Sequence, residues 1–544
     1  MKVNIGSLYD NKSDWAAAGI KLPGYNPVDT AVLTANAPVW VHFGAGNIFR
    51  GFIAGLQQRL LNEGLTDKGI IAAETYDFDI VDLVYKPFDN LVVNVTLNAD
   101  ATIDCEITAS ITEAVKSDSA GMSRLSEVFV QPGLQLATLT VTEKGYALYG
   151  ADGGFLPVIK SDVQNDPDKA RHVISIITAL LYKRYLAGRL PLAAVSLDNC
   201  SHNGERLRSG IVEIAKAWVK NNVMEERFLE YLTDAQTVSF PWSMIDKITP
   251  RPDKSAAAML NVMGIEGMEP VITGKNTFIA PFVNAERPFR LVIEDSFPNG
   301  RPPLERAGVY FADRETVNKA ERMKVNTCLN PLHTAMSVYG CLLGYDRISD
   351  EMKDPVITAL INRLGYTEGL PVVTDPGIFS PKAFIDEVIN DRLPNPFIPD
   401  TPQRIATDTS QKVGVRFGET VKSYINEGRD LSALIAVPLA IAGWFRYLLG
   451  VDDTGAPMDV SPDPLKDGLT ETLRGVVWND RASYRGQALS ILSNARIFGL
   501  DLSRTVLGER VEAYLILMLG GAGAVRETLK KTLREAGHHE NVYG

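Results

Sequence analysis

The sequence is poor in the residues that build disulfide and metal sites. It has four cysteines and six histidines among 544 residues, and no two cysteines form a Cys-x-x-Cys pair. Neither a disulfide framework nor a zinc knuckle is therefore indicated. Cys328 and His333 are close in sequence but lack two further ligands at a recognisable spacing, so we expect no metal site.

Long apolar runs and clusters of basic residues are also missing. No segment approaches the ~20 apolar residues of a membrane helix, and the start, MKVNIGSLYDNKSDW, has no apolar stretch of signal-peptide length. We therefore expect a cytoplasmic protein without membrane contacts. The formal net charge is −11 with no dense Lys/Arg run, which argues against a nucleic-acid partner. A small anionic substrate stays compatible, because a few local cations can oppose the global charge.

The remaining composition is typical of a globular protein with large cores. Hydrophobic residues make up 45% and charged residues 22% of the chain, and 544 residues are too many for one core. Strands alternate with helices over residues 1–310, which predicts an α/β domain with a parallel sheet. Helical periodicity dominates from about Asn318, so residues 311–544 are predicted to form a mainly α-helical second domain. The oligomeric state stays open.

A glycine turn follows the first predicted strand of the α/β domain, residues 39–43. Gly44 and Gly46 in HFGAGNIFRG lie between this strand and an amphipathic helix, where backbone N–H groups can approach a pyrophosphate. Phe49 replaces the third glycine of the GxGxxG pattern, so that helix and strand pack less closely. By itself the motif fits a dinucleotide site and a structural turn equally well.

The next predicted strand, in KGIIAAETYD, ends in acidic residues. Glu74 is a candidate for accepting hydrogen bonds from an adenosine ribose, and its charge would repel a 2′-phosphate, which favours NAD over NADP. Asp77 and Asp79 are close by, and Glu74 also fits a solvated loop residue. Asn47 and Arg50 complete the predicted cofactor-binding set, although Arg50 equally fits an exposed helix arginine.

The stretch ERMKVNTCLNPLH concentrates side chains that suit the reduction of a ketone or the oxidation of a secondary alcohol. Such a reaction needs a group that moves a proton and donors that hold the developing alkoxide. Lys324 is a candidate acid/base, with Asn330 and His333 as partners. Glu321 lies one helical turn earlier, and Asn199 in SLDNCSHNG follows another predicted strand. The alternative is a solvated lysine, an Asn-Pro helix start and a packed histidine.

Several stretches resemble, in order, the long-chain polyol dehydrogenase family, which includes mannitol 2-dehydrogenase, fructuronate reductase and tagaturonate reductase. They cover most of the chain, and are HFGAGNIFRGF, TVTEKGY, SLDNCSHNG, FPWSMIDKITP, IEDSFPNGRPPLE, CLNPLHTA, RIATDTSQK and WFRYLLGVDD. The resemblance implies a metal-independent NAD(P)-linked oxidoreductase with the active site in the cleft between two domains. Residues 1–310 would then form a Rossmann-type, doubly wound NAD-binding domain, and residues 311–544 the mainly α-helical substrate and catalytic domain.

The resemblance also implies a role for each candidate. The family's lysine acid/base falls on Lys324, preceded at the same interval by Glu321. Its two oxyanion-binding asparagines fall on Asn199 and Asn330, its substrate-orienting histidine on His333, and its fingerprint glycines on Gly44 and Gly46.

One spacing departs from the family pattern. Four residues usually separate the lysine from the asparagine, whereas KVNTCLN places five between Lys324 and Asn330. One extra helical residue rotates every later side chain by about 100°, so a bulge or a non-helical turn is required. Asn326 is then a rival for the oxyanion role. We prefer Asn330, because its pairing with His333 in Asn-x-x-His is intact.

The substrate is predicted from two further cues. Arg404 and Lys412 lie in a stretch that resembles the family's substrate-side loop, where a cation binds a uronate carboxylate or a sugar hydroxyl. The NPLH form, in place of NGxH, is more similar to the uronate reductases. We predict NADH-linked reduction of D-fructuronate to D-mannonate. The alternatives are a mannitol 2-dehydrogenase, a tagaturonate reductase or, from another class, a catalytically inactive NAD-binding regulatory protein.

Overall fold

The computed structural model describes residues 1–98, 100 and 102–543, with side chains up to residue 537. The chain forms two compact units. The first holds residues 1–98 and 102–318, and the second begins at Lys319. The expected boundary lies at residue 310, and in the structure β15 (Tyr310–Ala312) pairs in parallel with β14 (Arg290–Glu294) in a sheet of the first unit.

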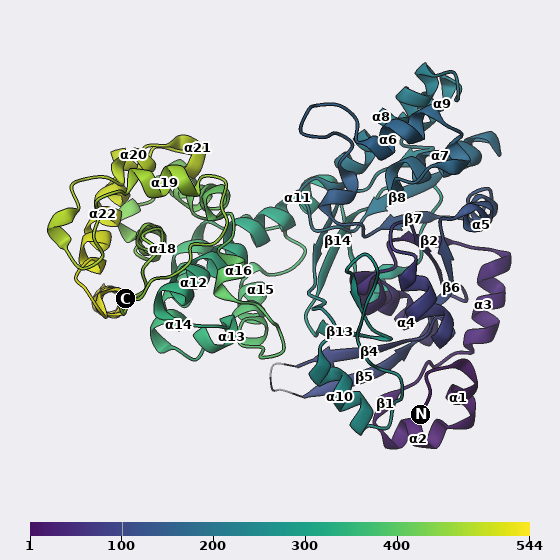
Figure 1. Cartoon of the computed structure of the whole chain (residues 1–544), viewed down its shortest axis with the longest axis horizontal. Helices are drawn as coiled ribbons and strands as arrows, with labels where there is room; N and C mark the ends of the chain where they lie inside the picture. The colour runs from purple at the N-terminus through teal and green to yellow at the C-terminus, as the bar shows by residue number, and fades with distance from the viewer. Residues whose placement is uncertain (99, 101, 544) are drawn as a thin grey trace. The chain divides into compact units, whose positions relative to one another are not determined.

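A six-stranded parallel sheet forms the centre of the first unit (Figure 1). Its order, β6-β3-β2-β7-β8-β9, starts in the middle at β2 and runs outward to one edge and then to the other. This is the order of a doubly wound Rossmann sheet, with its switch point between β2 and β7. The predicted fold class is confirmed. The strands are β2 (Trp40–Phe43), β3 (Ile70–Glu74), β6 (Ile111–Lys116), β7 (Leu136–Leu139), β8 (Leu192–Ser196) and β9 (Val238–Ser239).

Helices cover both faces of this sheet, which explains the continuous apolar runs of its strands. In β2, Val41 and Phe43 belong to the core under α5, α7 and α8, whereas Trp40 belongs to the core under α4. The helices are α4 (Ala54–Asn62), α5 (Ser119–Phe129), α7 (Val173–Leu186) and α8 (Asn203–Lys220).

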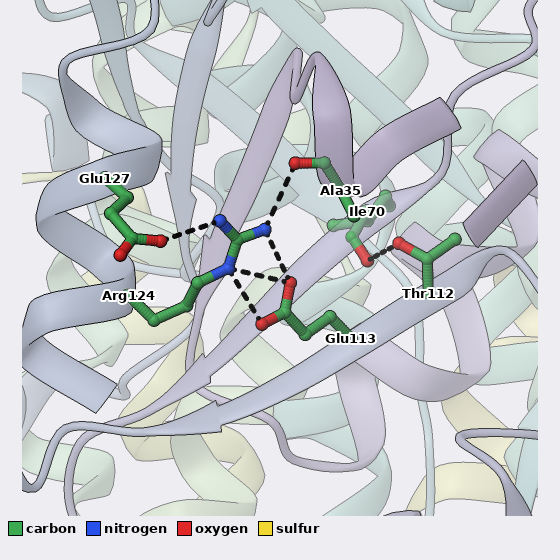
Figure 2. A network of polar contacts seen from close by, with 6 residues as sticks. All are labelled: Ala35, Ile70, Thr112, Glu113, Arg124 and Glu127. Atoms are coloured by element: carbon green, nitrogen blue, oxygen red, sulfur yellow. Dashed lines mark hydrogen bonds and ion pairs between the residues drawn. The ribbon is translucent and has the colours of Figure 1, made fainter. Parts of the chain in front are cut away.

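Arg124 on α5 anchors two helices to the edge strand β6 (Figure 2). Its Nε lies 3.0 and 3.2 Å from the two carboxylate oxygens of Glu113 on β6. The same guanidinium donates to Glu127 on α5 and, at 3.4 Å, to the carbonyl of Ala35 in α3 (Pro27–Asn36). Hydrogen bonding to Glu113 raises the pKa of Arg124. The network therefore fixes α3 and α5 at the edge next to β3.

Smaller sheets flank the central one in the first unit. A four-stranded sheet runs in the order β1-β5-β4-β13, and a three-stranded sheet in the order β10-β14-β15. A hairpin, β11 (Val271–Ile272) and β12 (Phe278–Ile279), lies between β10 and β13 in the sequence. The other bounds are β1 (Ile20–Lys21), β4 (Val92–Leu97), β5 (Ile103–Thr108), β10 (Ser243–Asp246) and β13 (Phe282–Glu286).

The second unit consists of helices around one apolar core. Helix α18 is buried along its whole length and packs against α12 and α22. The predicted helical character after Asn318 is confirmed. In the part of the chain that the structure describes, no helix has the length and apolarity needed to cross a membrane. The main helices are α11 (Arg314–Met323), α12 (Asn330–Leu343), α14 (Pro355–Asn362), α17 (Glu419–Asn426), α18 (Ala436–Tyr447), α22 (Val506–Met518) and α23 (Ala524–Tyr543).

Candidate active site

The two glycines after β2 differ in whether the backbone has room for a Cβ. Gly44 has φ +98°, and its N–H donates to the Ala73 carbonyl at 2.9 Å. A Cβ on Gly44 would lie 2.9 Å from the carbonyl carbon of Thr140 and overlap its oxygen. A Cβ on Gly46 would meet nothing within 4 Å. The turn itself therefore requires Gly44, whereas Gly46 leaves open space beside the backbone.

Phe49, at the place of the third glycine, stacks on a buried histidine. Its ring lies parallel to that of His42 on β2, with the centroids 4.1 Å apart. His42 bonds through its ring nitrogens to the hydroxyls of Thr138 and Thr140, at 2.6 and 2.8 Å. Burial lowers the pKa of His42 to about 3, so the ring is neutral. Phe49 thus fills the space between strand and helix that a glycine would have closed.

Arg50 and Asn47 bring unsatisfied polar atoms to the same turn. Arg50 is fully buried, and none of its guanidinium nitrogens has a hydrogen-bond partner among the described residues. Oδ1 of Asn47 is also buried without a partner among them. Burial lowers the pKa of Arg50, whose guanidinium lies 5.4 Å from the centre of the Tyr85 ring. Such a cation costs several kcal/mol unless an anion compensates it, so the residues present fit a pyrophosphate. The alternative of an exposed helix arginine is wrong.

Glu74 holds the glycine turn to the loop after β3. One carboxylate oxygen accepts from the N–H of Ala45 at 2.9 Å, and the other from Tyr76 and Asp77 at 2.8 and 3.1 Å. Glu74 is only 5% exposed, so the alternative of a solvated loop residue is wrong. Its contact with a ribose stays a prediction. Of its neighbours, Asp79 accepts from the N–H of Gly274 in the β11–β12 hairpin at 3.1 Å.

Asp198 joins the segments that follow β7 and β8. Its carboxylate accepts from two N–H groups of the segment after β7, both at 2.9 Å, and from the Tyr146 hydroxyl at 2.7 Å. The Tyr146 hydroxyl also bonds to Oγ of Ser196 at 2.6 Å. Burial raises the pKa of both Asp198 and Tyr146. Asn199 follows Asp198 in the chain, so the Tyr146–Asp198 hydrogen bond helps to fix the position of the loop that carries Asn199. Sequence reasoning missed the pair, although both residues lie in stretches that resemble the family, TVTEKGY and SLDNCSHNG.

Lys324 opens a π-helical turn, Lys324–Cys328, directly after α11. The N–H of Leu329, five residues on, donates to the Lys324 carbonyl at 3.1 Å. A π-helical turn takes up an extra residue, and the backbone then leaves the helical conformation at Leu329, with φ −132° and ψ −61°, before α12 begins. The extra residue before Asn330 is thus absorbed by a π-helical turn followed by one non-helical residue. Lys324 is 3% exposed, and Glu321 lies one turn earlier on α11.

His333 lies one turn after Asn330 on the first part of α12, so the two side chains share one side of the helix. Nε2 of His333 is 3.9 Å from the carboxylate of Asp400. Burial lowers the pKa of His333 to about 4, against the opposing effect of Asp400, and nearby arginines lower it further. The ring is therefore neutral at neutral pH and can both donate and accept a hydrogen bond.

Arg404 and Lys412, expected on the substrate side, have partners within the second unit. Arg404 forms an ion pair with Asp400. Nζ of Lys412 donates to the backbone carbonyls of Thr407 and Ile405, the latter at 3.3 Å. Burial lowers the pKa of Lys412. Their contacts with a substrate stay predictions.

The structure thus gathers the candidates in two sets. Around the turn after β2 lie the predicted cofactor residues, while Asn199 belongs to the same unit at the end of β8. The second unit carries the lysine, the histidine and the cations. Within the described residues, no group of three or more His, Cys, Asp or Glu side chains is arranged to hold a metal ion. The first set is Gly44, Gly46, Asn47, Arg50 and Glu74, and the second is Glu321, Lys324, Asn330, His333, Arg404 and Lys412.

Comparison with known proteins places both units in one family. Residues 39–306 match the mannitol dehydrogenase Rossmann domain, and residues 316–515 match the mannitol dehydrogenase C-terminal domain. D-mannonate oxidoreductase of Thermotoga maritima is 48% identical over 544 residues, which cover 99% of this chain and 100% of the relative.

Two solved structures share the fold. The Pseudomonas fluorescens mannitol 2-dehydrogenase in ternary complex with NAD and D-mannitol has a TM-score of 0.68 and 25% identity. The match covers 98% of this chain and 100% of that one. A substrate-free D-sorbitol dehydrogenase has a TM-score of 0.75 at 24% identity, over 95% of this chain and 98% of that one. Both agree with a Rossmann domain followed by a helical domain.

Proposed function

Because the chain belongs to the mannitol dehydrogenase family, we propose that it is an NAD-linked oxidoreductase that interconverts D-fructuronate and D-mannonate. The observation that carries the proposal is the 48% identity, over the full length of both chains, to a D-mannonate oxidoreductase. The family itself supports an enzyme that acts on a CH–OH group of a sugar acid or polyol. The uronate substrate is the part of the proposal that the substrate panel below tests.

The proposed cofactor is NAD, held at the turn after β2. Gly46 leaves room for the pyrophosphate beside the backbone, and Arg50 would supply the opposing charge. When bound, the nicotinamide would supply or accept the hydride. The solved mannitol 2-dehydrogenase with NAD supports this cofactor, and the acid at Glu74 makes NADP the less favoured choice.

In the proposed mechanism, Lys324 transfers a proton to the substrate oxygen when the ketone is reduced, and removes it in the reverse direction. The amide of Asn330 donates to the substrate oxygen while negative charge develops on it, and the amide of Asn199 is proposed as a further donor. Neutral His333 orients the substrate through its ring nitrogens. Glu321, one turn before the lysine, relays protons between Lys324 and solvent.

A substrate panel tests the proposal. We expect the purified protein to oxidise NADH with D-fructuronate at a kcat/KM at least about ten times that for tagaturonate or fructose, and to prefer NADH to NADPH. The measurement is the initial rate of NADH or NADPH consumption with each ketone. Turnover of fructose alone would contradict the uronate assignment.

The same assay decides between the two asparagines near Lys324. Asn330→Ala is expected to lower kcat/KM by about 100-fold, since it removes a donor to the developing alkoxide. Asn326→Ala should stay within about threefold, because Asn326 lies inside the π-helical turn, before the α-helix that carries both Asn330 and His333. A larger loss with Asn326→Ala would transfer the oxyanion role to Asn326.

The alternative within the family is a mannitol 2-dehydrogenase. It is favoured by the structural likeness to the Pseudomonas fluorescens enzyme, which extends over 98% of this chain. That likeness comes with 25% identity, about half of that to the D-mannonate oxidoreductase. The oxidation rates of mannitol and mannonate with NAD separate the two functions directly.

A further inference from the structure

Three arginines from separate segments of the second unit lie around His333. The positive charges of Arg392, Arg404 and Arg416 each lower the pKa of His333, so all three oppose its protonation. Arg392 ends the π-helical turn Val388–Arg392, and Arg404 lies on α16 (Pro402–Ile405). No sequence pattern predicted Arg392 or Arg416 beside His333. The arrangement concentrates positive charge at the residue that is proposed to orient the substrate.

The acid next to His333 is already engaged by one of these cations. Asp400 favours the protonation of His333, and Arg404 forms an ion pair with the same carboxylate. Among the described residues, Asp400 pairs with Arg404 and not with Arg416. Because the chain as a whole carries a net charge of −11, the positive charge gathered here is opposite in sign to that of the whole protein.

Arg416 is a cation without an acidic partner. Its Nη1 donates to the hydroxyl of Thr334, the residue after His333, and it forms no ion pair with any acid in the part of the chain that the structure describes. The Thr334 hydroxyl in turn donates to the Asn330 carbonyl at 3.0 Å. Burial lowers the pKa of Arg416 to about 10, so it stays charged at neutral pH. A partly buried guanidinium facing a neutral hydroxyl suits an added carboxylate.

The backbone around Arg416 is firmly placed. Arg416 lies in the π-helical turn Gly414–Gly418, which packs against α12 and against the π-helical turn of Lys324. Both glycines approach the backbone of residues 497–498 so closely that a Cβ on either would overlap a carbonyl oxygen. A rigid support of this kind holds a charged side chain at a fixed position relative to the reacting groups.

We propose that Arg416, assisted by Arg392, binds the carboxylate of the sugar acid and selects it over an uncharged polyol or ketose. The inference rests on the proposed function and names the part of the site that recognises the acid. The guanidinium matches a carboxylate with two parallel N–H donors, whereas a terminal hydroxyl offers one weaker acceptor. D-fructuronate carries its carboxylate at the end where fructose carries a hydroxymethyl group, so one residue there can separate the two substrates.

The test compares Arg416→Met, which removes the charge and keeps the length, with Arg416→Lys, which keeps the charge and removes the fork. For fructuronate we expect Arg416→Met to raise KM by about 10- to 100-fold with kcat within about threefold. Arg416→Lys should recover part of that loss. The NADH dissociation constant and the apparent Tm should change little. Arg474→Met is the matched control, because the Arg474 side chain is 77% exposed, and it should leave KM unaltered.

The outcomes separate this inference from the proposed function. If the unaltered enzyme reduces no uronate, the proposed function fails, and this inference fails with it. If it reduces fructuronate and Arg416→Met leaves KM within about threefold, the carboxylate role alone is overturned. The carboxylate role is equally overturned if Arg416→Lys recovers nothing, or if residual turnover of fructose falls as much as that of fructuronate.

Discussion

Replacement of Lys324 by alanine is expected to lower kcat by about 10²- to 10⁴-fold, because it removes the proposed acid/base. Lys324 is 3% exposed and opens the π-helical turn that leads into Asn330. Without its ammonium group, the proton would have to come from water. The effect should fall on kcat more than on KM, because the proton moves in the transition state.

The measurement for Lys324→Ala combines steady-state rates with an NADH titration by fluorescence. Binding of NADH should survive, since the cofactor residues lie around Gly44 in the other unit. Lys353→Ala serves as the control, because the Lys353 side chain is 74% exposed. Partial recovery of the rate on adding a small primary amine would support a proton-transfer role. Near-normal turnover would remove Lys324 from the mechanism.

The sheet could be predicted from the sequence because buried parallel strands appear as uninterrupted apolar runs. Strand β3 (Ile70–Glu74) is buried at every residue, and its apolar run is uninterrupted up to Glu74. The glycine turn after β2 was compatible with a dinucleotide-binding unit, although by itself it fitted a structural turn equally well. The pairing of the short β15 with β14 could not be predicted, because pairing partners are not visible in one strand's own sequence.

The identities of the candidate residues were easier to predict than their surroundings. Arg50 is buried without a hydrogen-bond partner for its guanidinium among the described residues, and Arg416 lies near His333. Both facts depend on tertiary packing between segments that are distant in sequence. The Tyr146–Asp198 hydrogen bond likewise joins the ends of two strands. A residue type with the right chemistry can be recognised locally, but its charge environment is set by segments that are remote in sequence.

The π-helical turns show the same limit most clearly. Four cations proposed for ligand binding or catalysis, Arg50, Lys324, Arg392 and Arg416, each lie in such a turn. A π-helical turn is a less favourable backbone than an α-helix, and it recurs at functional sites because it redirects one side chain without ending the helix. The sequence showed one extra residue after Lys324, but not which local structure would absorb it.

Alanine at either glycine of the turn after β2 is expected to have a large effect, on protein stability at Gly44 and on NADH binding at Gly46. Gly44→Ala places a Cβ against the Thr140 carbonyl in a backbone at φ +98°, where L-residues are strained. We expect a loss of about 3 kcal/mol or more in stability, seen as a fall of several degrees in apparent Tm. Cofactor binding should fail as a consequence of the displaced β2 and β7 ends.

Gly46→Ala is the matched control for the fold and the direct test of the cofactor site. Its Cβ meets nothing within 4 Å, so the apparent Tm should stay within about 2 °C of the unaltered protein. The methyl group would instead stand where the proposed pyrophosphate approaches the backbone, and should weaken NADH binding at least about tenfold. Thermal unfolding and an NADH titration on the same two proteins check both statements. Normal NADH affinity in Gly46→Ala would mean that the turn shapes the fold but does not hold the phosphates, and Arg50 would then need another anion.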